Sequence, residues 1–248
     1  MPHDFESSSD RSLEAHFEEL AGLHGKFHGE FTKDRAAETV DDHADRLLRI
    51  DAALLAELAA RPRPLVLDSF CGSGHSTAWL AHRHPGHLVV GIDKSAHRLA
   101  RHPHDPAGQY LLLQAECEDL WRLLSERAIG VDHHYLLYPN PWPKAKHLQR
   151  RVHGSAGFYW LRQLAAATRP TEAAPGHIEL RSNWQIYVEE FGVAMHLAGF
   201  PGGVARVPPE AADLTLFERK YRASGHALWA YTGRSRGLPP RDDAGLLG

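Results

Sequence analysis

The alternation of short apolar runs with helical segments after residue 64 constrains the fold more than any other feature of the sequence. Each run is short enough to be a buried strand, and the segments between the runs carry apolar residues at helical spacing. Strands are predicted at 65–67, 87–92, 109–113, 131–137, 176–181 and 227–231. Helices are predicted at 77–81, from Ser95 to before Pro103, and at 117–125, 158–167 and 184–198. This alternation predicts an α/β protein with a mostly parallel, doubly wound sheet and helices on both faces.

The alternation covers residues 61–231, which we expect to form one domain. Residues 1–60 precede it as an acidic extension that we expect to be mainly helical, because apolar residues recur at helical spacing from 36 to 60. Residues 200–216 are rich in proline and glycine and are expected to be irregular. Residues 232–248 are expected to form a flexible tail.

Composition excludes several classes of protein. No apolar run approaches the ~20 residues that span a bilayer, and the polar, acidic N-terminus does not have the pattern of a signal peptide. Cys71 and Cys117 are the only cysteines among 248 residues, which excludes a disulfide scaffold and indicates a reducing cytoplasm. The nineteen histidines are scattered without the spacing that is typical of zinc ligands, so the sequence predicts no metal site.

Charge is distributed unevenly along the chain. Residues 1–60 contain fourteen acidic and six basic residues, a net charge of −8, whereas the whole chain has a net charge of −3. No acidic residue lies between Asp132 and Glu172, and that stretch contains six cations. Four of these cluster within eight residues, namely Lys144, Lys146, Arg150 and Arg151. The cluster favours an anion-binding surface over a merely solvated basic face, and the acidic extension would repel a polyanion.

The turn after the first predicted strand is typical of a nucleotide-like ligand site. Asp68-Ser69-Phe70-Cys71-Gly72-Ser73-Gly74 lies between a strand and a helix, and Asp93 ends the next strand. Glycines let the backbone approach a ligand, and an acid at position 93 can accept hydrogen bonds from ribose hydroxyls. Thr77 stands where the dinucleotide fingerprint requires a third glycine, which disfavours a pyrophosphate. Asp68, the first residue of the turn, suits the cationic groups of S-adenosylmethionine. Together with Asp93 it favours a binding site over a turn that only connects a strand to a helix.

A proline-rich loop follows the strand at 131–137. Its sequence is Tyr138-Pro139-Asn140-Pro141-Trp142-Pro143-Lys144. Three prolines at alternate positions fix φ, so the loop is rigid and its side chains lose little entropy when a ligand binds. Asn140 offers two hydrogen-bond donors and one acceptor group, and Trp142 offers a stacking face. A structural turn is the alternative, but the position after a strand and the adjacent cations favour binding.

With these residues the sequence resembles the bacterial tRNA (guanine-N7)-methyltransferase family. The family has a loop similar to P-D-P-W-P-K-x-R-H-x-K-R-R, which is here P-N-P-W-P-K-A-K-H-L-Q-R-R at 139–151. Its T-D-W-x-x-Y segment corresponds to S-N-W-Q-I-Y at 182–187. Its T-x-F-E-x-R-G-x-x-x-G-H segment corresponds to T-L-F-E-R-K-Y-R-A-S-G-H at 215–226. The resemblance covers residues 64–231, and the first motif is very specific.

The resemblance implies a Rossmann-like class I methyltransferase with S-adenosylmethionine as methyl donor and N7 of a tRNA guanine as acceptor. The cofactor-binding residues that it implies are Asp68, Cys71, Gly72, Gly74, Asp93, Glu116 and Asn140. Among them Asp93 would hold the ribose, Glu116 would lie near the adenine, and Cys71 is interpreted as a packing residue rather than a nucleophile. The implied catalytic residues are Asn140 and Glu218. The implied substrate-binding residues are Trp142, Lys144, Arg150, Arg151, Asn183, Thr215 and Glu218.

The sequence also departs from the family pattern. Asn140 and Asn183 stand where the family has aspartates, Lys220 replaces an arginine and Tyr221 a glycine. A hydrogen bond to a charged group is worth about 1.5–3 kcal/mol and a neutral one about 0.5–1.5 kcal/mol, so two neutral amides weaken selectivity for guanine.

The departures leave alternatives open. One is a diverged paralogue that methylates a small heteroaromatic or nucleoside-like molecule. Another is a non-catalytic RNA-binding or cofactor-binding protein, against which the retained glycine turn, Asp93 and Glu218 argue. The leading expectation is a cytoplasmic tRNA methyltransferase without a membrane partner.

Overall fold

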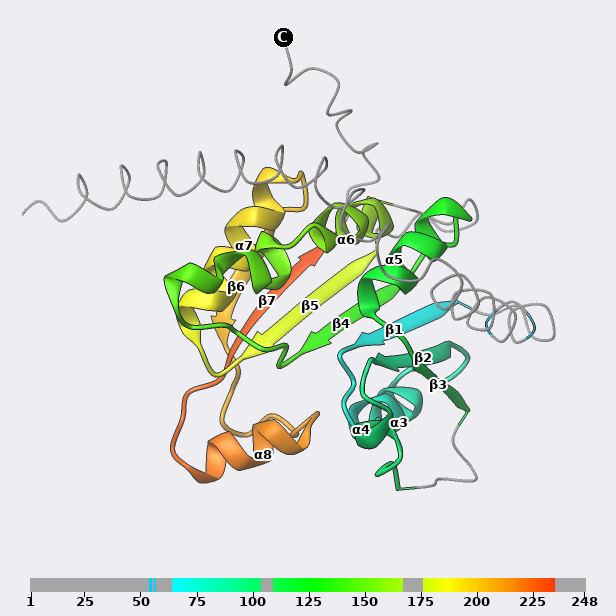
Figure 1. The fold of residues 1–248 in the computed structure, drawn as a ribbon. Helices are drawn as coiled ribbons and strands as arrows, with labels where there is room; N and C mark the ends of the chain where they lie inside the picture. Colours follow the sequence, from blue (N-terminus) through cyan, green and yellow to red (C-terminus); the bar gives the residue numbers. More distant parts are fainter. Residues whose placement is uncertain (1–53, 55, 57–63, 104–108, 167–175, 235–248) are drawn as a thin grey trace, which may run out of the picture.

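The computed structural model describes residues 54, 56, 64–103, 109–166 and 176–234 (Figure 1). The predicted extension at 1–60 lies outside the described residues apart from positions 54 and 56, which are helical. Leu54 is buried in the main core. Residues 235–248 of the predicted tail also lie outside the described part of the chain.

A seven-stranded sheet forms the centre of the domain. Its strands, in spatial order, are β3 (Tyr110–Gln114), β2 (Leu88–Asp93), β1 (Leu65–Ser69), β4 (His133–Leu137), β5 (His177–Ser182), β7 (Trp229–Arg234) and β6 (Gly202–Arg206). The first five are parallel, whereas β7 runs antiparallel to β5 and β6 antiparallel to β7. This arrangement confirms the predicted α/β class with a mostly parallel sheet.

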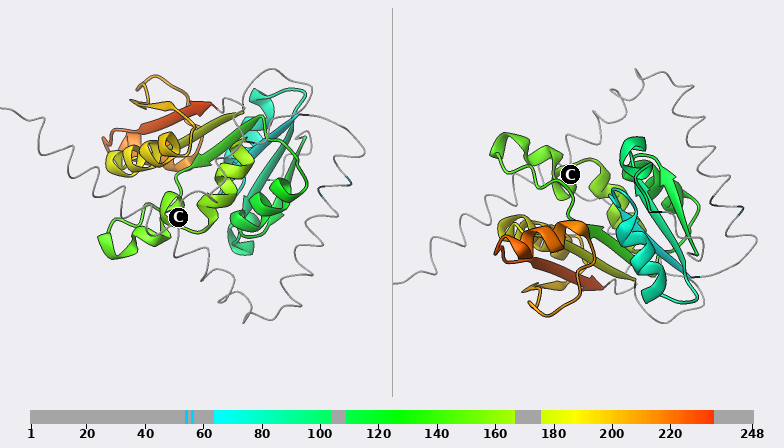
Figure 2. Two further views of the ribbon diagram at one scale, coloured as in Figure 1. Left: turned by 90° about the horizontal axis from the view of Figure 1, so that it is seen from above. Right: turned by 90° about the horizontal axis from the view of Figure 1, so that it is seen from below.

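Helices cover both faces of the sheet (Figures 1 and 2). The helices are α3 (His75–Arg83), α4 (Ala96–Leu99), α5 (Cys117–Glu126), α6 (Gly157–Ala166), α7 (Gln185–Leu197) and α8 (Leu216–Ala223), with 3₁₀ turns η1 (Ala145–Arg150) and η2 (Val152–Gly154). Helices α5, α6 and α7 enclose the larger apolar core on one face, and α3 encloses a smaller one on the other. The predicted Ser95 cap of α4 is confirmed, since its Oγ accepts a hydrogen bond from the backbone N–H of Arg98.

Burial on two faces explains why the central strands are continuous apolar runs. Leu65, Val66 and Leu67 of β1 have no exposed surface, and they alternate between the two cores. Trp121 of α5 is buried in the larger core, and its indole N–H donates to Ser69 Oγ at 2.9 Å. Because both faces of the sheet are filled, a ligand of this domain has to bind at an edge where the strands end.

The C-terminal third differs from the expectation in three respects. Residues 200–216 were expected to be irregular, but they contain β6, and the unpredicted α8 begins at Leu216. The sequence carries no apolar alternation for β6 because all five of its residues are exposed, and the strand is defined by its ladder with β7. Strand β7 runs to Arg234, three residues beyond the expected domain boundary.

Gly91 lies in the middle of β2 where α3 crosses the sheet. A Cβ atom added there would overlap Thr77 Oγ1 and would lie 2.8 Å from Leu112 Cδ2. Since Thr77 also donates to buried Asp68, the added atom would displace a side chain that is already fixed.

We expect Gly91→Ala to lower the free energy of unfolding by about 1–3 kcal/mol, because overpacking forces side chains from their rotamers. Gly203→Ala in β6 is the matched control, since a Cβ there meets nothing within 4 Å. The control should change the free energy by less than about 0.5 kcal/mol in urea unfolding at equilibrium. Equal losses for the two variants would contradict the close approach of α3 to β2.

Candidate active site at the carboxyl edge of the sheet

The carboxyl ends of β1, β4 and β5 converge on one edge of the sheet (Figure 1). The chain passes from β1 outward to β2 and β3, and then returns to β4 on the other side of β1. Open α/β sheets bind ligands in the crevice at such a switch point. The glycine turn follows β1, the proline-rich loop follows β4, and Asn183 follows β5. The topology therefore brings together three motifs that are far apart in the sequence.

The glycine turn adopts a left-handed backbone at three positions. The φ angles of Phe70, Gly72 and Gly74 are 65°, 62° and 75°. The turn is tied to β2, because the N–H of Cys71 donates to the carbonyl of Ile92 at 3.0 Å. A Cβ on Gly72 would meet nothing within 4 Å, so open space lies beside the backbone. This is the close backbone approach that a cofactor requires.

Asp68 lies beneath the turn and is fully buried. Its Oδ2 accepts hydrogen bonds from Ser76 Oγ and Thr77 Oγ1, both at 2.7 Å, and so ties β1 to the first turn of α3. Its Oδ1 is buried and has no hydrogen-bond partner among the described residues. Burial raises the pKa of the Asp68 carboxyl to about 6; the bonds from Thr77 and Ser76 oppose the rise, and Asp93 adds to it. An unpaired buried acceptor favours a donor or a cation brought by a ligand.

Asp93, the last residue of β2, is the second buried acid of the site. Its Oδ2 accepts from the N–H of Gly72 at 3.0 Å, and its Oδ1 accepts from the N–H of Ser95 at 2.8 Å. Arg98 lies 3.1 Å from Oδ1 but is half exposed. Each carboxylate oxygen can accept more than one hydrogen bond, so Asp93 keeps capacity for a ribose hydroxyl while it fixes the turn.

The remaining expected cofactor residues are placed around this turn. Glu116 precedes α5 and its carboxylate lies 3.5 Å from Lys94 Nζ. Burial raises the pKa of the Cys71 thiol, as it does for Cys117, and both cysteines are free and buried. The thiolate needed for nucleophilic chemistry is therefore disfavoured at Cys71, in agreement with its interpretation as a packing residue.

The proline-rich loop, residues 138–144, is held by its own backbone and side chains. The N–H of Tyr138 donates to the carbonyl of Arg181, which extends the pairing of β4 with β5. Asn140 is exposed, and its Oδ1 accepts from the N–H of Trp142 at 3.2 Å. The guanidinium of Arg150 lies 4.7 Å from the centre of the Trp142 ring. The loop thus presents an amide and a cation-capped indole beside the crevice.

Arg151, which is expected to bind substrate, is buried in the structure behind the proline-rich loop. Its side chain is 6% exposed and pairs with Glu190 of α7. It also donates to the carbonyls of Trp142 and Pro143 at 3.3 and 3.4 Å. Burial opposes ionisation of Glu190, but hydrogen bonds from His153 and Arg151 outweigh it and lower the pKa of the carboxyl. Arg151 therefore braces the loop from behind, whereas Lys144 and Arg150 are exposed.

Thr215 and Glu218 were expected to form part of the acceptor pocket, with Glu218 catalytic. Thr215 is instead the N-cap of α8, where its Oγ1 accepts from the N–H of Glu218 at 3.1 Å. Glu218 has no exposed surface, accepts from the N–H of Leu214, and pairs with Arg181 at 3.0 Å. Both side chains thus make contacts that hold α8 in place, and the buried carboxylate of Glu218 is already paired with Arg181 and the N–H of Leu214.

Three aromatic side chains, which no sequence motif predicts to be neighbours, stack on one another at this edge. Tyr138 stacks on Tyr221 of α8, with ring centres 5.8 Å apart and planes at 29°. Phe217 stacks on both of them, with ring centres 6.4 and 6.3 Å away. The spacing of four residues between Phe217 and Tyr221 is the signal that could have revealed this surface, because such residues share one helix face. Asn183 lies half-buried between β5 and α7.

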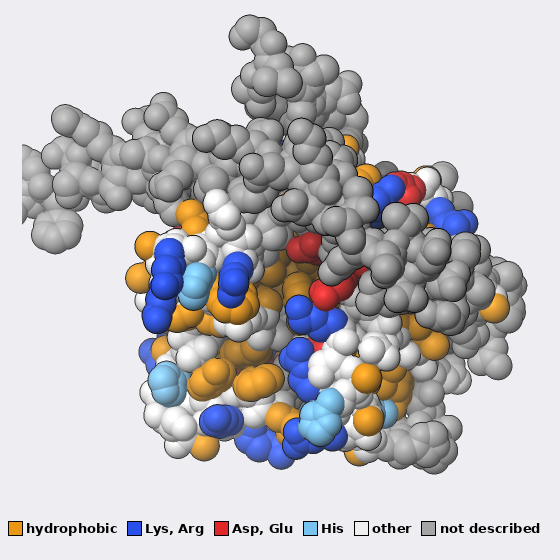
Figure 3. Space-filling model, viewed as in Figure 1, with side chains coloured by type: hydrophobic (Ala, Val, Ile, Leu, Met, Phe, Trp, Pro, Cys, Tyr) orange, Lys and Arg blue, Asp and Glu red, His pale blue; other side chains and the backbone are white. Residues whose placement is uncertain are grey.

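Cations surround this edge. Figure 3 shows Lys and Arg side chains around hydrophobic ones, in the areas where Figure 1 draws the loop after β4 and α8. The exposed cations of these two segments are Lys144, Lys146, Arg150, Arg219 and Lys220. Basic residues around an aromatic surface suit a polyanion that carries stacking groups.

Comparison with known proteins places this site in a family. The family model described as "Putative methyltransferase" matches residues 62–196, from before β1 into α7. The chain belongs to this methyltransferase family. It is 30% identical over 191 residues to a tRNA (guanine-N(7)-)-methyltransferase of Nitrosospira multiformis, covering 71% of this chain and 76% of that protein. It is 28% identical to a protein of the same name from Sphingopyxis alaskensis, covering 79% and 88%.

Solved structures agree on the fold. The crystal structure of the 16S rRNA methyltransferase KamB has a TM-score of 0.55 and 26% identity, and the match covers 74% of this chain and 93% of that one. An aminoglycoside resistance methyltransferase, NpmB1, has a TM-score of 0.50 at 20% identity, covering 73% and 91%. The fold is thus the Rossmann-like class I methyltransferase fold that the resemblance implied.

The protein is an S-adenosylmethionine-dependent methyltransferase, and its carboxyl edge fits that cofactor. The fit rests on the unpaired Oδ1 of Asp68, the open space beside Gly72 and the remaining acceptor capacity of Asp93. Family membership supports an enzyme over a non-catalytic binding protein. No helix in the described part of the chain is long and apolar enough to cross a membrane.

The pKa of Asp68 predicts how cofactor binding by this methyltransferase depends on pH. Without cofactor the carboxyl pKa is about 6. A cationic cofactor favours the ionised form of Asp68. Below a pH of about 6 the carboxyl is mostly protonated, so cofactor binding then requires the release of a proton. We expect affinity for S-adenosylmethionine to fall as the pH drops from about 7 to about 5 in calorimetry.

Asp68→Asn keeps an oxygen acceptor for Ser76 and Thr77 but cannot ionise. It should bind the cofactor more weakly at neutral pH and should lose the pH dependence. Glu126→Gln, at the exposed end of α5, is the control and should behave as the wild type. The same pH dependence in Asp68→Asn and the wild type would show that Asp68 does not face the cofactor.

The contrast between two adjacent arginines tests the loop geometry. Arg150→Ala should leave the free energy of unfolding unchanged, weaken binding to bulk RNA as a polyanion probe and reduce its salt slope by about one. Arg151→Ala removes the ion pair with Glu190, which keeps His153 as a partner, and should lower the free energy of unfolding by about 1–3 kcal/mol. Urea unfolding and salt titrations separate the two effects. Equal stability of both variants would contradict the bracing role of Arg151.

Proposed function

We propose that this enzyme methylates N7 of a guanine in tRNA and acts in the cytoplasm. The observation that carries the proposal is the similarity to proteins named tRNA (guanine-N(7)-)-methyltransferase, at 26–30% identity over about three quarters of the chain. The proline-rich loop and the exposed cations after β4 support it, because they lie at the carboxyl edge where the cofactor turn also lies.

Methyl transfer to guanine N7 requires no proton transfer by the protein before the methyl group moves. When bound, S-adenosylmethionine supplies an electrophilic methyl group on its sulfonium. Guanine N7 carries a free lone pair, so no base has to deprotonate it, and catalysis depends on alignment. The burial of Glu218 in an ion pair with Arg181 is compatible with such a reaction. We propose that Asn140 orients the acceptor, because its exposed amide lies at the crevice and is held by the N–H of Trp142.

We propose that the acceptor base stacks beside Trp142 and that phosphates contact the nearby cations. Lys144, Lys146 and Arg150 are exposed on the loop, and Arg219 and Lys220 are exposed on α8. Phosphate contacts of this kind position an RNA without reading its sequence. The acceptor amides Asn140 and Asn183 follow neighbouring strands and would read the base.

A second candidate is a different acceptor, either a nucleobase of 16S rRNA or a small heteroaromatic molecule. The similarity to the 16S rRNA methyltransferase KamB at 26% identity favours the former. Asn140 and Asn183 are compatible with either acceptor, since they stand where the family pattern has the carboxylates that would accept hydrogen bonds from guanine. Tyr221, which replaces a glycine of the family pattern, also fills space over this edge by stacking on Tyr138.

Methyl transfer from labelled S-adenosylmethionine decides between these acceptors. The full chain is incubated separately with bulk tRNA, with small ribosomal subunits and with a small-molecule extract. Labelled tRNA is then digested to nucleosides, and 7-methylguanosine is identified by mass. Label in 7-methylguanosine from tRNA is the expected result. Label confined to 16S rRNA or to the extract would overturn the tRNA proposal in favour of the second candidate.

The paired amides supply a sharper prediction. If both face guanine, the double variant Asn140→Asp with Asn183→Asp should methylate tRNA roughly tenfold faster, from about 1.4 kcal/mol of better acceptor bonding. Gln185→Glu, which adds a charge at an exposed position at the start of α7, is the control for charge alone. A loss of activity in the double variant would indicate an acceptor without donors for carboxylates, because an acceptor that covers an unpaired carboxylate has to desolvate it. No change on any substrate would remove both residues from the acceptor pocket.

A further inference from the structure

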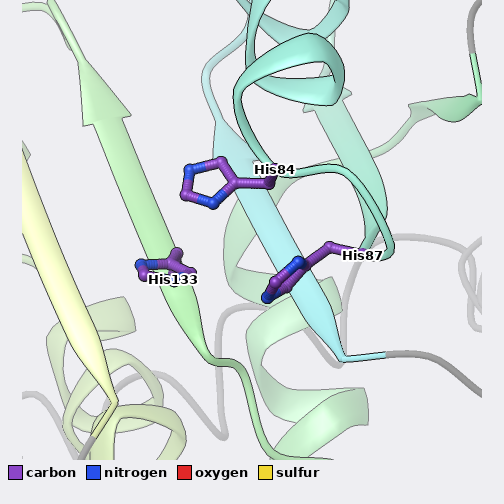
Figure 4. Close-up of side chains that lie close together, drawn as sticks. All are labelled: His84, His87 and His133. Atoms are coloured by element: carbon purple, nitrogen blue, oxygen red, sulfur yellow. The ribbon is translucent and has the colours of Figure 1, made fainter.

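A group of histidines lies at the amino edge of the sheet, opposite the methyltransferase site (Figure 4). His84 follows α3, His87 precedes β2, and His133 is the first residue of β4. His84 and His87 lie on one turn, whereas His133 comes from a strand more than forty residues further along the chain. The three side chains lie close together (Figure 4). His177, the first residue of β5, lies beside them, with its ring centre 5.4 Å from that of His133. The sequence spacing predicted no metal site, and only the fold creates this group.

The geometry of the three imidazoles is that of a nearly assembled ligand set. One nitrogen from each of His84, His87 and His133 lies within 4.8 Å of the other two. Tetrahedral coordination by nitrogen at about 2.0–2.1 Å separates ligand atoms by roughly 3.4 Å, so small side-chain rotations would complete it. The rings of His84 and His133 are already in contact, with centres 4.4 Å apart.

The ring nitrogens lack sufficient protein partners. The Nδ1 atoms of His87 and His133 are buried and have no hydrogen-bond partner in the described ranges. His84 Nε2 lies 2.9 Å from the hydroxyl of Tyr135, an outer contact that orients its ring. Unpaired buried nitrogens are costly in a core, and a bound cation would offset that cost.

Burial also disfavours the protonated form of two of the imidazoles, those of His84 and His133. Burial, with neighbouring His133 and His87, lowers the pKa of His84 to about 4. Burial and nearby His177 and His87 lower the pKa of His133 to about 4, against the opposing effect of Asp132. Neutral imidazole is the form that binds metals, so the environments of His84 and His133 are compatible with the ligand geometry.

Solvent reaches two of the three histidines. A surface pocket of about 330 Å³ is lined by His84 and His87 together with His82, Gln109 and the intervening turn. A cation can approach these two side chains through the pocket, and water can supply a further ligand there. The exposed Arg83 guanidinium lies 5.3 Å from the centre of the Trp79 ring and is near enough to contribute to the lowered pKa of His84 and of His133, so a bound cation has to outweigh its charge.

We propose that His84, His87 and His133 form a site for a divalent transition-metal ion, with zinc the fitting probe. Three imidazoles with an open position suit zinc, and they also suit cobalt or nickel, because nitrogen ligands bind all of these ions. The site joins the end of α3 to the start of β4 at the edge away from the cofactor turn. It therefore stabilises the domain without taking part in methyl transfer.

Zinc binding to the full chain tests the site, measured by calorimetry in buffer without chelators. His84→Ala and His133→Ala should each weaken the tightest zinc site by roughly tenfold or more. Matched controls are His97→Ala on α4 and His196→Ala on α7, which replace exposed histidines of other elements. Both controls should bind zinc as the wild type does. Wild-type affinity in the two test variants, or equal losses in the controls, would overturn the proposal.

Two further measurements keep the test independent of misfolding. Cofactor binding at the opposite edge reports whether a variant is folded. If His133→Ala does not bind cofactor, His87→Ala takes its place in the test, because His87 is a half-buried loop residue whose loss disturbs the sheet less. Zinc at a hundredfold excess over its dissociation constant should raise the melting temperature of the wild type by roughly 5–10 °C, with no shift for His87→Ala. Absence of the shift in the wild type, or the same shift in both, would overturn the site.

Discussion

Two buried carboxylates determine the shape of the cofactor turn, and much of the site depends on them. Asp68 connects β1 to α3 through Ser76 and Thr77, and Asp93 connects β2 to Gly72. Buried charges require partners, so each acid fixes the backbone groups around it. The turn can then adopt its left-handed angles and leave open space beside Gly72. The same acids that shape the turn keep acceptor capacity toward the cofactor.

A second set of buried ion pairs positions the acceptor side. Arg151 and Glu190 connect the proline-rich loop to α7, and Arg181 and Glu218 connect β5 to α8. Burial opposes the charge on Arg181, but Glu179 and Glu218 outweigh it and raise the pKa of Arg181, so its guanidinium stays charged. Arg151 and Glu218, which the family motifs suggest as site residues, thus form ion pairs that hold the loop and α8 in place. Such bracing suits a reaction that depends on alignment rather than on proton transfer.

The two edges of the sheet differ in chemistry. At the carboxyl edge, acids, amides and exposed cations surround a left-handed turn, as a cationic cofactor and a polyanionic acceptor would require. At the amino edge, three histidine side chains lie together, and two of them line a surface pocket. Separation of the proposed metal site from the reaction allows an ion to stabilise the sheet without perturbing the cofactor charge.

The sequence by itself determined the parallel sheet, the glycine turn and the order of the motifs. It could do so because apolar periodicity is a local property and because strands that are buried on both faces are continuous apolar runs, as in β1 and β2. It missed β6, whose five residues are exposed and whose structure comes from pairing with a strand that follows it in the chain.

Only the tertiary structure decided which polar residues face the crevice. Arg150 and Arg151 are adjacent and chemically identical, yet one is exposed beside Trp142 and the other is buried against Glu190. Likewise, the histidines at 84, 87 and 133 have no common sequence pattern and meet only through the pairing of β1 with β2 and β4. Burial and long-range contact depend on segments distant in the chain, and no local pattern encodes them.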